Sequence, residues 1–247
     1  MDYQVIINQH LEDIDNLLVL ANQMHIPLDR ESANILIVYL HSLLDKNSSI
    51  NLTAINDFSK GIILHLIDSL TLLYEFDKYK IKSFVDIGSG GGLPAIPLLI
   101  SNKSVMGIMC ESIKKKTDAL QQFINELNLK SRAIVVNDRA ENLMDILPYQ
   151  PDCVTCRAVA KMNTLIEYAS PLLMKDCCLF IMKGTPDIQE LNDANRAAKI
   201  CGFTLSQSRT FELPNDYGSR TIYTYIKTHE AKIKLPRRIG LAKAKPL

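Results

Sequence analysis

One short segment, from Ser83 to Pro94, constrains the fold of this chain more than any other. A short apolar strand carries Asp86 near its end, a glycine-rich turn follows, and a proline stands in the first turn of a helix, where its missing N–H costs little. Glycine lets the backbone adopt positive φ and approach a ligand closely. The segment therefore predicts a strand–turn–helix unit of an open α/β sheet, which binds ligands at this edge.

The chemistry of this turn narrows the choice of ligand. A dinucleotide fingerprint needs a third glycine, and Leu93 occupies its place. The Asp86 carboxylate would repel a pyrophosphate, whereas S-adenosylmethionine carries an ammonium and a sulfonium and no phosphate. The pattern acid-x-Gly-x-Gly, from Asp86 to Gly90, resembles the first motif of S-adenosylmethionine-dependent methyltransferases. An ordinary tight turn between strand and helix is the alternative.

Charge is nearly balanced over the chain but unevenly distributed. The net charge of the 247 residues is +1, so no global field attracts nucleic acid. From residue 232 to the end, however, every charged residue is basic: Lys232, Lys234, Arg237, Arg238, Lys243 and Lys245. Such a local basic tail can bind phosphates.

The sequence indicates a cytoplasmic protein without a membrane partner. The chain starts without an apolar signal core, and the run Ile35 to Leu40 is too short to span a bilayer. The six cysteines resemble small buried hydrophobes of a reducing compartment. Cys153 and Cys156 are three apart on an expected strand, so they point to opposite faces and cannot share a ligand. We expect no metal, and a monomer.

Hydrophobic periodicity divides the chain into a helical part and an alternating part. Apolar residues recur at helical spacing in the first eighty residues, with a break at Asn47-Ser48-Ser49. Strands are predicted at 83–87, 104–110, 132–136, 152–156 and 178–182, and helices at 95–101, 113–128, 160–174 and 187–200. This alternation implies a parallel sheet. The last two strands, 203–211 and 221–227, are joined too closely for a crossover and form an antiparallel hairpin.

Polar residues follow several of these strands at the same edge of the sheet. Glu111 ends the second strand and can accept both hydroxyls of a ribose. Arg139-Ala140-Glu141 follows the third strand and either flanks an adenine or simply starts a helix. Arg157 and Lys183 end the fourth and fifth strands, where each could hold a phosphate or a base edge or remain exposed.

His65 and Asp68 are three residues apart on a predicted helix and share a face that is not the apolar stripe. They form either a hydrogen-bonded structural pair or part of the substrate mouth.

A set of segments, in one order, resembles the bacterial 16S rRNA guanine-N7 methyltransferase family RsmG, formerly GidB. These are Asn51-Leu52-Thr53, His65-x-x-Asp68-Ser69-Leu70, Asp86 to Leu98, Glu111-Ser112-x-x-Lys115-Lys116, Arg139-Ala140-Glu141, Arg157-Ala158-Val159-Ala160, Lys183-Gly184 and Pro236-Arg237-Arg238-x-Gly240 with Pro246-Leu247. The resemblance covers residues 51–247. Ala95 replaces a usual glycine, and Leu64 replaces a basic residue, which puts an RNA role of that helix in doubt.

The resemblance implies the class I S-adenosylmethionine-dependent methyltransferase fold. This α/β fold is Rossmann-like, with a mostly parallel seven-stranded sheet, a C-terminal antiparallel hairpin and an N-terminal helical extension. We expect the extension at 1–80, the methyltransferase domain at 81–230 and a basic tail at 231–247.

The family's cofactor site implies contacts from Gly88, Leu93, Ala140, Glu141 and Arg157. Asp86 and Glu111 are added from physical reasoning, and Gly90 is counted with the glycine turn. Arg139, Lys183, Arg237 and Arg238 are the RNA-binding candidates. We expect loss of Arg237 and Arg238 to weaken RNA binding and to leave cofactor affinity unchanged, because the glycine turn and Glu111 belong to a separate part of the chain.

The implied reaction is transfer of a methyl group to a guanine N7 in the 530 loop of 16S rRNA, free or in the small ribosomal subunit. This nitrogen has a free lone pair and loses no proton, so no catalytic acid or base is assigned.

Three alternatives to this function remain. They are a small-molecule methyltransferase, a cytosine-C5 methyltransferase, which needs a cysteine nucleophile, and a non-catalytic RNA-binding protein that retains the fold.

Overall fold

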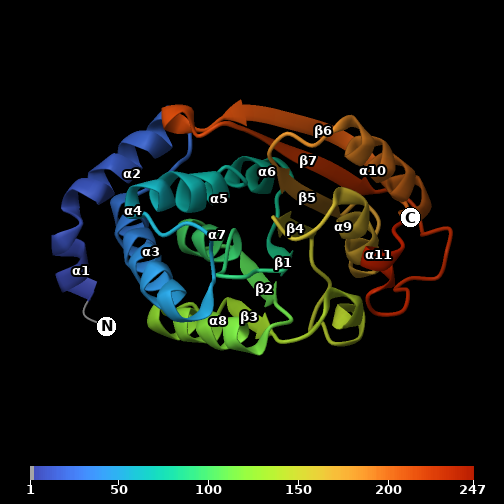
Figure 1. Cartoon of the computed structure of the whole chain (residues 1–247), viewed down its shortest axis with the longest axis horizontal. Coiled ribbons are helices and arrows are strands. Elements are labelled where there is room, and N and C mark those ends of the chain that lie inside the picture. The colour runs from blue at the N-terminus through green and yellow to red at the C-terminus, as the bar shows by residue number, and fades with distance from the viewer. Residues whose placement is uncertain (1–2) are drawn as a thin grey trace.

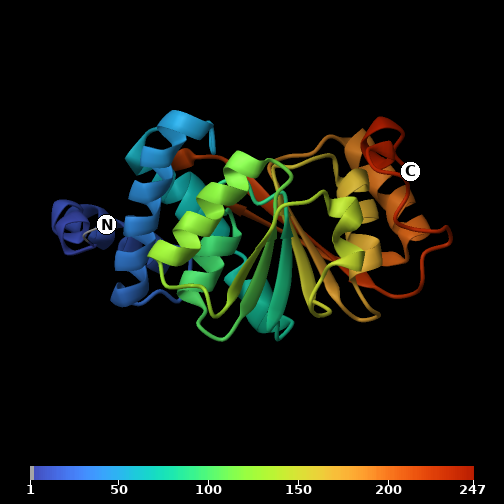
Figure 2. The same cartoon turned by 90° about the horizontal axis from the view of Figure 1, so that it is seen from below.

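Seven strands form one sheet between two layers of helices (Figure 1; Figure 2). The computed structural model describes residues 3–247. The strands follow the order β3-β2-β1-β4-β5-β7-β6 across the sheet. Their bounds are β1 Ser83–Ile87, β2 Met106–Cys110, β3 Ala133–Val136, β4 Cys153–Arg157, β5 Cys178–Lys183, β6 Phe203–Glu212 and β7 Ser219–Lys227. The predicted mostly parallel seven-stranded sheet is confirmed.

Strand pairing fixes the edge at which ligands can bind. β1 pairs in parallel with both β2 and β4, and β2 with β3, so the carboxyl ends of these strands meet at one edge. β7 lies between β5 and β6 and is antiparallel to both, which confirms the predicted hairpin. The turns that follow β1 to β5 therefore share one side of the sheet.

Helices cover the two faces of the sheet unequally (Figure 2). On one face, α7 Ala95–Ser101 and α8 Lys114–Glu126 pack with the N-terminal helices. On the other, α9 Met162–Ala169 and α10 Ile188–Cys201 cover β4, β5 and β7. The remaining α-helices are α1 Tyr3–Gln9, α2 Leu11–Gln23, α3 Arg30–Ile50, α4 Phe58–Gly61, α5 Asp68–Leu70, α6 Leu73–Lys78 and α11 Leu241–Ala244. Short 3₁₀ helices span Ala140–Asp145, Ser170–Leu172 and Pro214–Asp216.

The predicted break at Asn47-Ser48-Ser49 is wrong, because α3 continues to Ile50. The Ser48 and Ser49 hydroxyls donate to the carbonyls of residues 45 and 46, three positions back, so they bind within the helix instead of ending it. The Asn47 side chain leaves the helix and binds both the N–H and the carbonyl of Thr53. It therefore shapes the loop that follows α3.

A π-helical turn, Ile62–Ile67, joins α4 to α5. Single turns of this kind occur frequently at functional sites because they shift side chains relative to an α-helix. His65 and Asp68 lie in and just after this turn, and both line the cavity at the ligand edge of the sheet. None of the helices between residues 3 and 247 combines the length and the apolar character that crossing a membrane requires.

Candidate cofactor and substrate cavity

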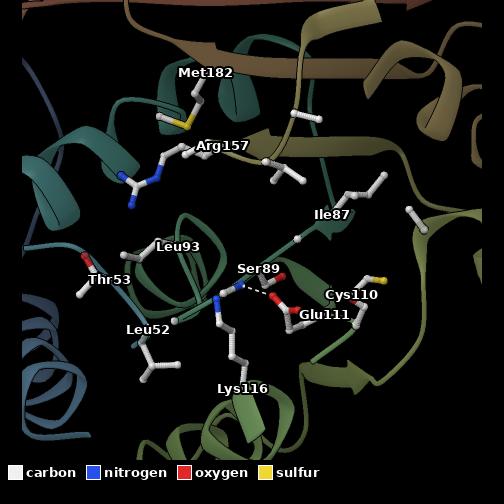
Figure 3. A pocket seen from close by; sticks show the side chains of 18 of the residues that line it. Leu52, Thr53, Ile87, Ser89, Leu93, Cys110, Glu111, Lys116, Arg157 and Met182 are labelled. Carbon is white, nitrogen blue, oxygen red and sulfur yellow. Dashed lines mark hydrogen bonds between the residues drawn. The ribbon is translucent and has the colours of Figure 1, made fainter. Parts of the chain in front are cut away.

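A cavity of about 950 Å³ opens at the carboxyl ends of the strands, within the size range of small-molecule sites. Its wall combines the loop after α3, the π-helical turn, and the turns after β1 to β5 (Figure 3). Of the predicted cofactor residues, the cavity wall includes Gly88, Gly90, Leu93, Glu111, Ala140, Glu141 and Arg157. Among the RNA-binding candidates it includes Arg139 and Lys183. The structure thus brings predicted site residues together from distant parts of the sequence: Gly88 and Lys183, for example, are 95 positions apart.

Two glycines of the turn meet different surroundings. A Cβ atom at Gly88 would lie 2.6 Å from the Val159 side chain, so packing alone excludes larger residues there. A Cβ atom at Gly90, where φ is +56°, would have no neighbour closer than 3.9 Å. Since Gly90 lines the cavity, its missing side chain leaves space that a ligand can fill against bare backbone.

Glu111 ties the turn to the next strand. One carboxylate oxygen accepts the Gly90 N–H at 3.2 Å (Figure 3). The other accepts the Ile113 N–H at 2.9 Å. The side chain is buried and lines the cavity. A carboxylate has about four acceptor sites, so lone pairs remain for ligand hydroxyls. This geometry suits the predicted ribose contact, which remains a prediction.

Asp86 lies behind the turn and outside the cavity wall. Side chains alternate along a strand, so Asp86 shares the face of Phe84 and is only 1% exposed. Its Oδ1 accepts the Thr155 hydroxyl at 2.8 Å, while Oδ2 has no hydrogen-bond partner among the described residues. Burial raises the pKa of Asp86 to about 7, against the opposing effects of Ser89, Thr155 and Arg157. A direct contact between Asp86 and the cofactor remains a prediction, because the cavity wall does not include this carboxylate.

Arg157 connects the end of β4 to the helical extension. Its Nη1 donates to the Leu64 carbonyl and to Asp68 Oδ2, both at 3.0 Å. The other Asp68 oxygen lies 3.6 Å from Arg220 Nε. The Asp68 carboxylate therefore lies between the guanidinium groups of Arg157 and Arg220 and pairs with both. All of these polar side chains line the cavity. The Asp68 bridge holds the two arginines in place.

His65 is a neutral member of the cavity wall. Its Nε2 and the Thr53 hydroxyl are 2.9 Å apart. Burial, assisted by the nearby Arg157 charge, lowers the pKa of His65 to about 4. Among the described residues, His65 and Asp68 bind different partners and do not form the predicted hydrogen-bonded pair, while both line the cavity. Their place at the substrate mouth remains a prediction.

The basic tail contacts one of the predicted cofactor residues. Gly240 N–H donates to Glu141 at 2.8 Å, and Lys243 lines the cavity. The expectation that the tail arginines leave cofactor affinity unchanged considered only the glycine turn and Glu111, and the contact with Glu141 argues against it. Sequence reasoning missed this contact because no local pattern reveals which distant loop a tail touches.

The RNA-binding candidates differ in their freedom to bind phosphate. Arg237 forms an ion pair with the buried Glu167, and Lys183 pairs with Glu190 at 2.7 Å. Arg139 is 45% exposed although it lies 3.5 Å from Glu141, and Arg238 is exposed. An RNA role for these four residues remains a prediction, and Arg139 and Arg238 are the most accessible of them.

Other cavity residues were not singled out as candidate site residues. Lys116 belongs to a run of three lysines that reads as a solvated helix face, yet it reaches the cavity beside the glycine turn (Figure 3). Tyr168, Met182 and Arg220 also line the cavity. Only helical or strand periodicity marks these positions in the sequence, and it does not distinguish a core residue from a cavity residue.

Comparisons with known proteins agree with this architecture. An O-methyltransferase from Bacillus cereus, solved in complex with SAH, superposes with a TM-score of 0.56 at 16% identity, over 84% of this chain and 95% of that one. The Ribosomal RNA small subunit methyltransferase G of Oenococcus oeni is 34% identical over 236 residues, or 94% of this chain and 97% of that protein. That of Carboxydothermus hydrogenoformans is 33% identical over 222 residues, or 89% and 94%.

The strand order, the antiparallel hairpin and the glycine turn at the ligand edge define a class I S-adenosylmethionine-dependent methyltransferase. A family model described as "GidB: rRNA small subunit methyltransferase G" matches residues 32–217. The chain belongs to this family, which confirms the resemblance stated from the sequence.

Proposed function

We propose that the protein methylates N7 of a guanine in the 530 loop of 16S rRNA, with S-adenosylmethionine as the methyl donor. The names of its relatives specify methylation of the small-subunit rRNA. The 530 loop, the guanine and its N7 atom are our own proposal. The substrate is either free rRNA or the small ribosomal subunit. Because bacterial ribosomes assemble in the cytoplasm, we place the protein there.

The strand order supports a division of the cavity between two ligands. Gly90, Glu111 and Glu141 follow β1, β2 and β3, which lie on one side of the sheet. Lys183 and Arg220 lie at β5 and β7 on the other side. We assign the first group to the cofactor and the second to the nucleobase and its phosphate, with Arg157 of β4 between them.

The protonation states of the cavity groups carry the proposal. His65 is neutral and bound to Thr53, and burial raises the pKa of Cys110, the thiol in the cavity wall, to about 12. The carboxylates of the wall are also engaged, since Asp68, Glu111, Asp138 and Glu141 each accept hydrogen bonds from the protein. A wall of this kind suits an acceptor that needs no deprotonation.

Guanine N7 is such an acceptor. When bound, the cofactor supplies an electrophilic methyl group on a sulfonium. The N7 lone pair forms the new C–N bond, the sulfur retains the electrons of the broken S–C bond, and no proton leaves the base. The residues of the protein therefore act by holding and orienting N7, which is catalysis by proximity.

Replacing the target guanine by 7-deazaguanine tests this assignment. A 530-loop RNA with 7-deazaguanine at the methylated position lacks the N7 lone pair, so we expect it to accept no labelled methyl group. The same RNA with guanine is the positive control, and competition for RNA binding checks that the analogue still binds. Methylation of the 7-deaza RNA at parental rate would contradict N7 transfer.

Cysteine replacement separates N7 transfer from cytosine-C5 chemistry. Cys153 and Cys156 are fully buried in different core clusters on opposite faces of the sheet, as their spacing predicts. Burial raises the pKa of both thiols well above the usual range, so neither is a ready nucleophile. We expect Cys153→Ala and Cys156→Ala to retain methyl transfer to RNA once any loss of folded protein is discounted. A folded variant that binds cofactor but transfers no methyl would show this expectation to be mistaken.

A further inference from the structure

The C-terminal segment Pro236–Lys245 is anchored to the methyltransferase core through one ion pair. Arg237 donates from Nε to Glu167 Oε1 at 2.6 Å and from Nη2 to Oε2 at 2.5 Å. The same Nη2 donates to the Lys245 carbonyl at 2.9 Å, so Arg237 also closes the segment on itself. Glu167 belongs to α9 and is 3% exposed. A paired, doubly hydrogen-bonded arginine of this kind fixes both position and direction.

Beyond the ion pair, the segment reaches the cavity. The Gly240 N–H donates to Glu141 Oε1 at 2.8 Å, and the Thr164 hydroxyl donates to the Ala242 carbonyl at 3.3 Å. Lys243 then lines the cavity. Glu141 is buried, and its second oxygen lies 3.5 Å from Arg139 Nε. The backbone of the segment thus holds a carboxylate of the cavity wall.

We infer that Pro236–Lys245 completes the cofactor cavity, to whose wall it contributes Lys243, and that Arg237 is a positioning residue for the adenine end of the cofactor. Arg237 holds the segment against α9, the Gly240 N–H then fixes Glu141 Oε1, and the orientation of Glu141 leaves Oε2 to accept an amino N–H from a purine. The inference rests on the proposed placement of the adenine at Ala140 and Glu141.

Arg237 and Arg238 are adjacent in the tail, but their charges have different environments, which supports different roles for them. The Arg237 charge is neutralised by a buried acid, while the neighbouring Arg238 is exposed and pairs with no acidic residue among the described ones. Two adjacent arginines therefore have different environments. Arg237 acts on the cofactor through the protein, and Arg238 remains available to RNA.

Paired variants of these two arginines provide the test. We expect Arg237→Ala to weaken binding of both S-adenosylhomocysteine and adenosine roughly tenfold, because a hydrogen bond to a charged group is lost or misdirected. The two ligands should lose affinity by the same factor, since they share the adenine. Arg237→Lys should recover part of the loss, and Arg238→Ala should bind both ligands like the parent. Titration calorimetry on the folded parent and the three folded variants measures the affinity for each of the two ligands.

Three outcomes would overturn the inference or its basis. Parental affinity in folded Arg237→Ala contradicts the positioning role, and so does a loss confined to S-adenosylhomocysteine, which would place the effect away from the adenine. A parent that binds neither ligand contradicts the cofactor site itself, independently of the tail.

If Arg237→Ala does not fold, a second variant tests the same inference. The double change Arg237→Met with Glu167→Gln removes the pair without leaving an unpaired buried carboxylate. We expect it to fold and to bind both ligands more weakly than the parent, by equal factors. Parental affinity in this variant also counts against the inference.

Discussion

Replacing Gly90 by alanine is expected to weaken binding of S-adenosylmethionine by up to roughly a hundredfold while the protein remains folded. The added methyl group would point into the cavity, where no protein atom lies within 3.9 Å, so only the ligand would be displaced. Overpacking of this kind costs about 1–3 kcal/mol, which corresponds to about fivefold to 150-fold in affinity. Titration calorimetry of the variant and the parent measures the difference.

Gly218 provides the matched control. It has φ +84° in the β6–β7 turn, and a Cβ atom there would meet nothing within 4 Å. Alanine at either position adopts an unfavourable left-handed conformation, at a cost of roughly 1–2 kcal/mol. We expect similar losses of thermal stability in Gly90→Ala and Gly218→Ala, but weaker cofactor binding only in the first. Equal cofactor affinity in the two variants would place the ligand away from the turn.

Two buried groups are expected to change the stability of the protein with pH in opposite directions. Asp86 has a pKa of about 7 in the folded protein and an ordinary value of 3.8. The folded state therefore binds the extra proton between these values, and stability from Asp86 falls as pH rises from about 4 to about 7. His65 has a pKa of about 4 against an ordinary 6.5. Here the unfolded state binds the extra proton, so stability rises with pH from about 4 to 6.5.

Single replacements separate the two effects. Each effect changes the free energy of unfolding by on the order of a few kcal/mol between the folded and the ordinary pKa of the group. Relative to the parent, Asp86→Asn should gain stability as pH rises from about 4 to 7, because the opposing slope is removed. His65→Gln should lose relative stability over pH 4 to 6.5. Urea unfolding at several pH values measures these differences, with the exposed Asp77→Asn as a control. A parallel pH dependence in parent and variant would mean that the replaced group is not buried as described.

The strands and the glycine turn could be predicted from the sequence because each depends on local order. Apolar runs of about five residues separated by amphipathic helices determine a parallel sheet, and the short link between β6 and β7 determines the hairpin. β1 and α7 lie at the predicted residues. The end of α3 was misplaced, because serine hydroxyls can bind inside a helix as well as outside it.

The cavity could be predicted only in part. Residues that directly follow a strand, such as Glu111 and Arg157, were found because their position at the sheet edge follows from topology. Asp86 was also expected at the ligand; strand alternation places its side chain on the face of Phe84 and outside the cavity wall, so this contact remains a prediction. The Arg237 pair and the Gly240 contact join residues about 70 and 99 positions apart, and no spacing rule in the chain links such residues.

The contacts between the helical extension and the hairpin have a consequence for cooperativity. Glu75 is fully buried and binds Arg209 of β6 through both carboxylate oxygens, and Arg209 also donates to the Thr71 carbonyl. One core cluster contains residues of α1 to α8 together with strand residues of β1, β5 and β7. Phe84 of the first strand packs against Phe76 of the extension, and the hairpin loses its partner acid without the extension. We therefore expect residues near 80 to mark a change of secondary structure but no boundary between independently folding units.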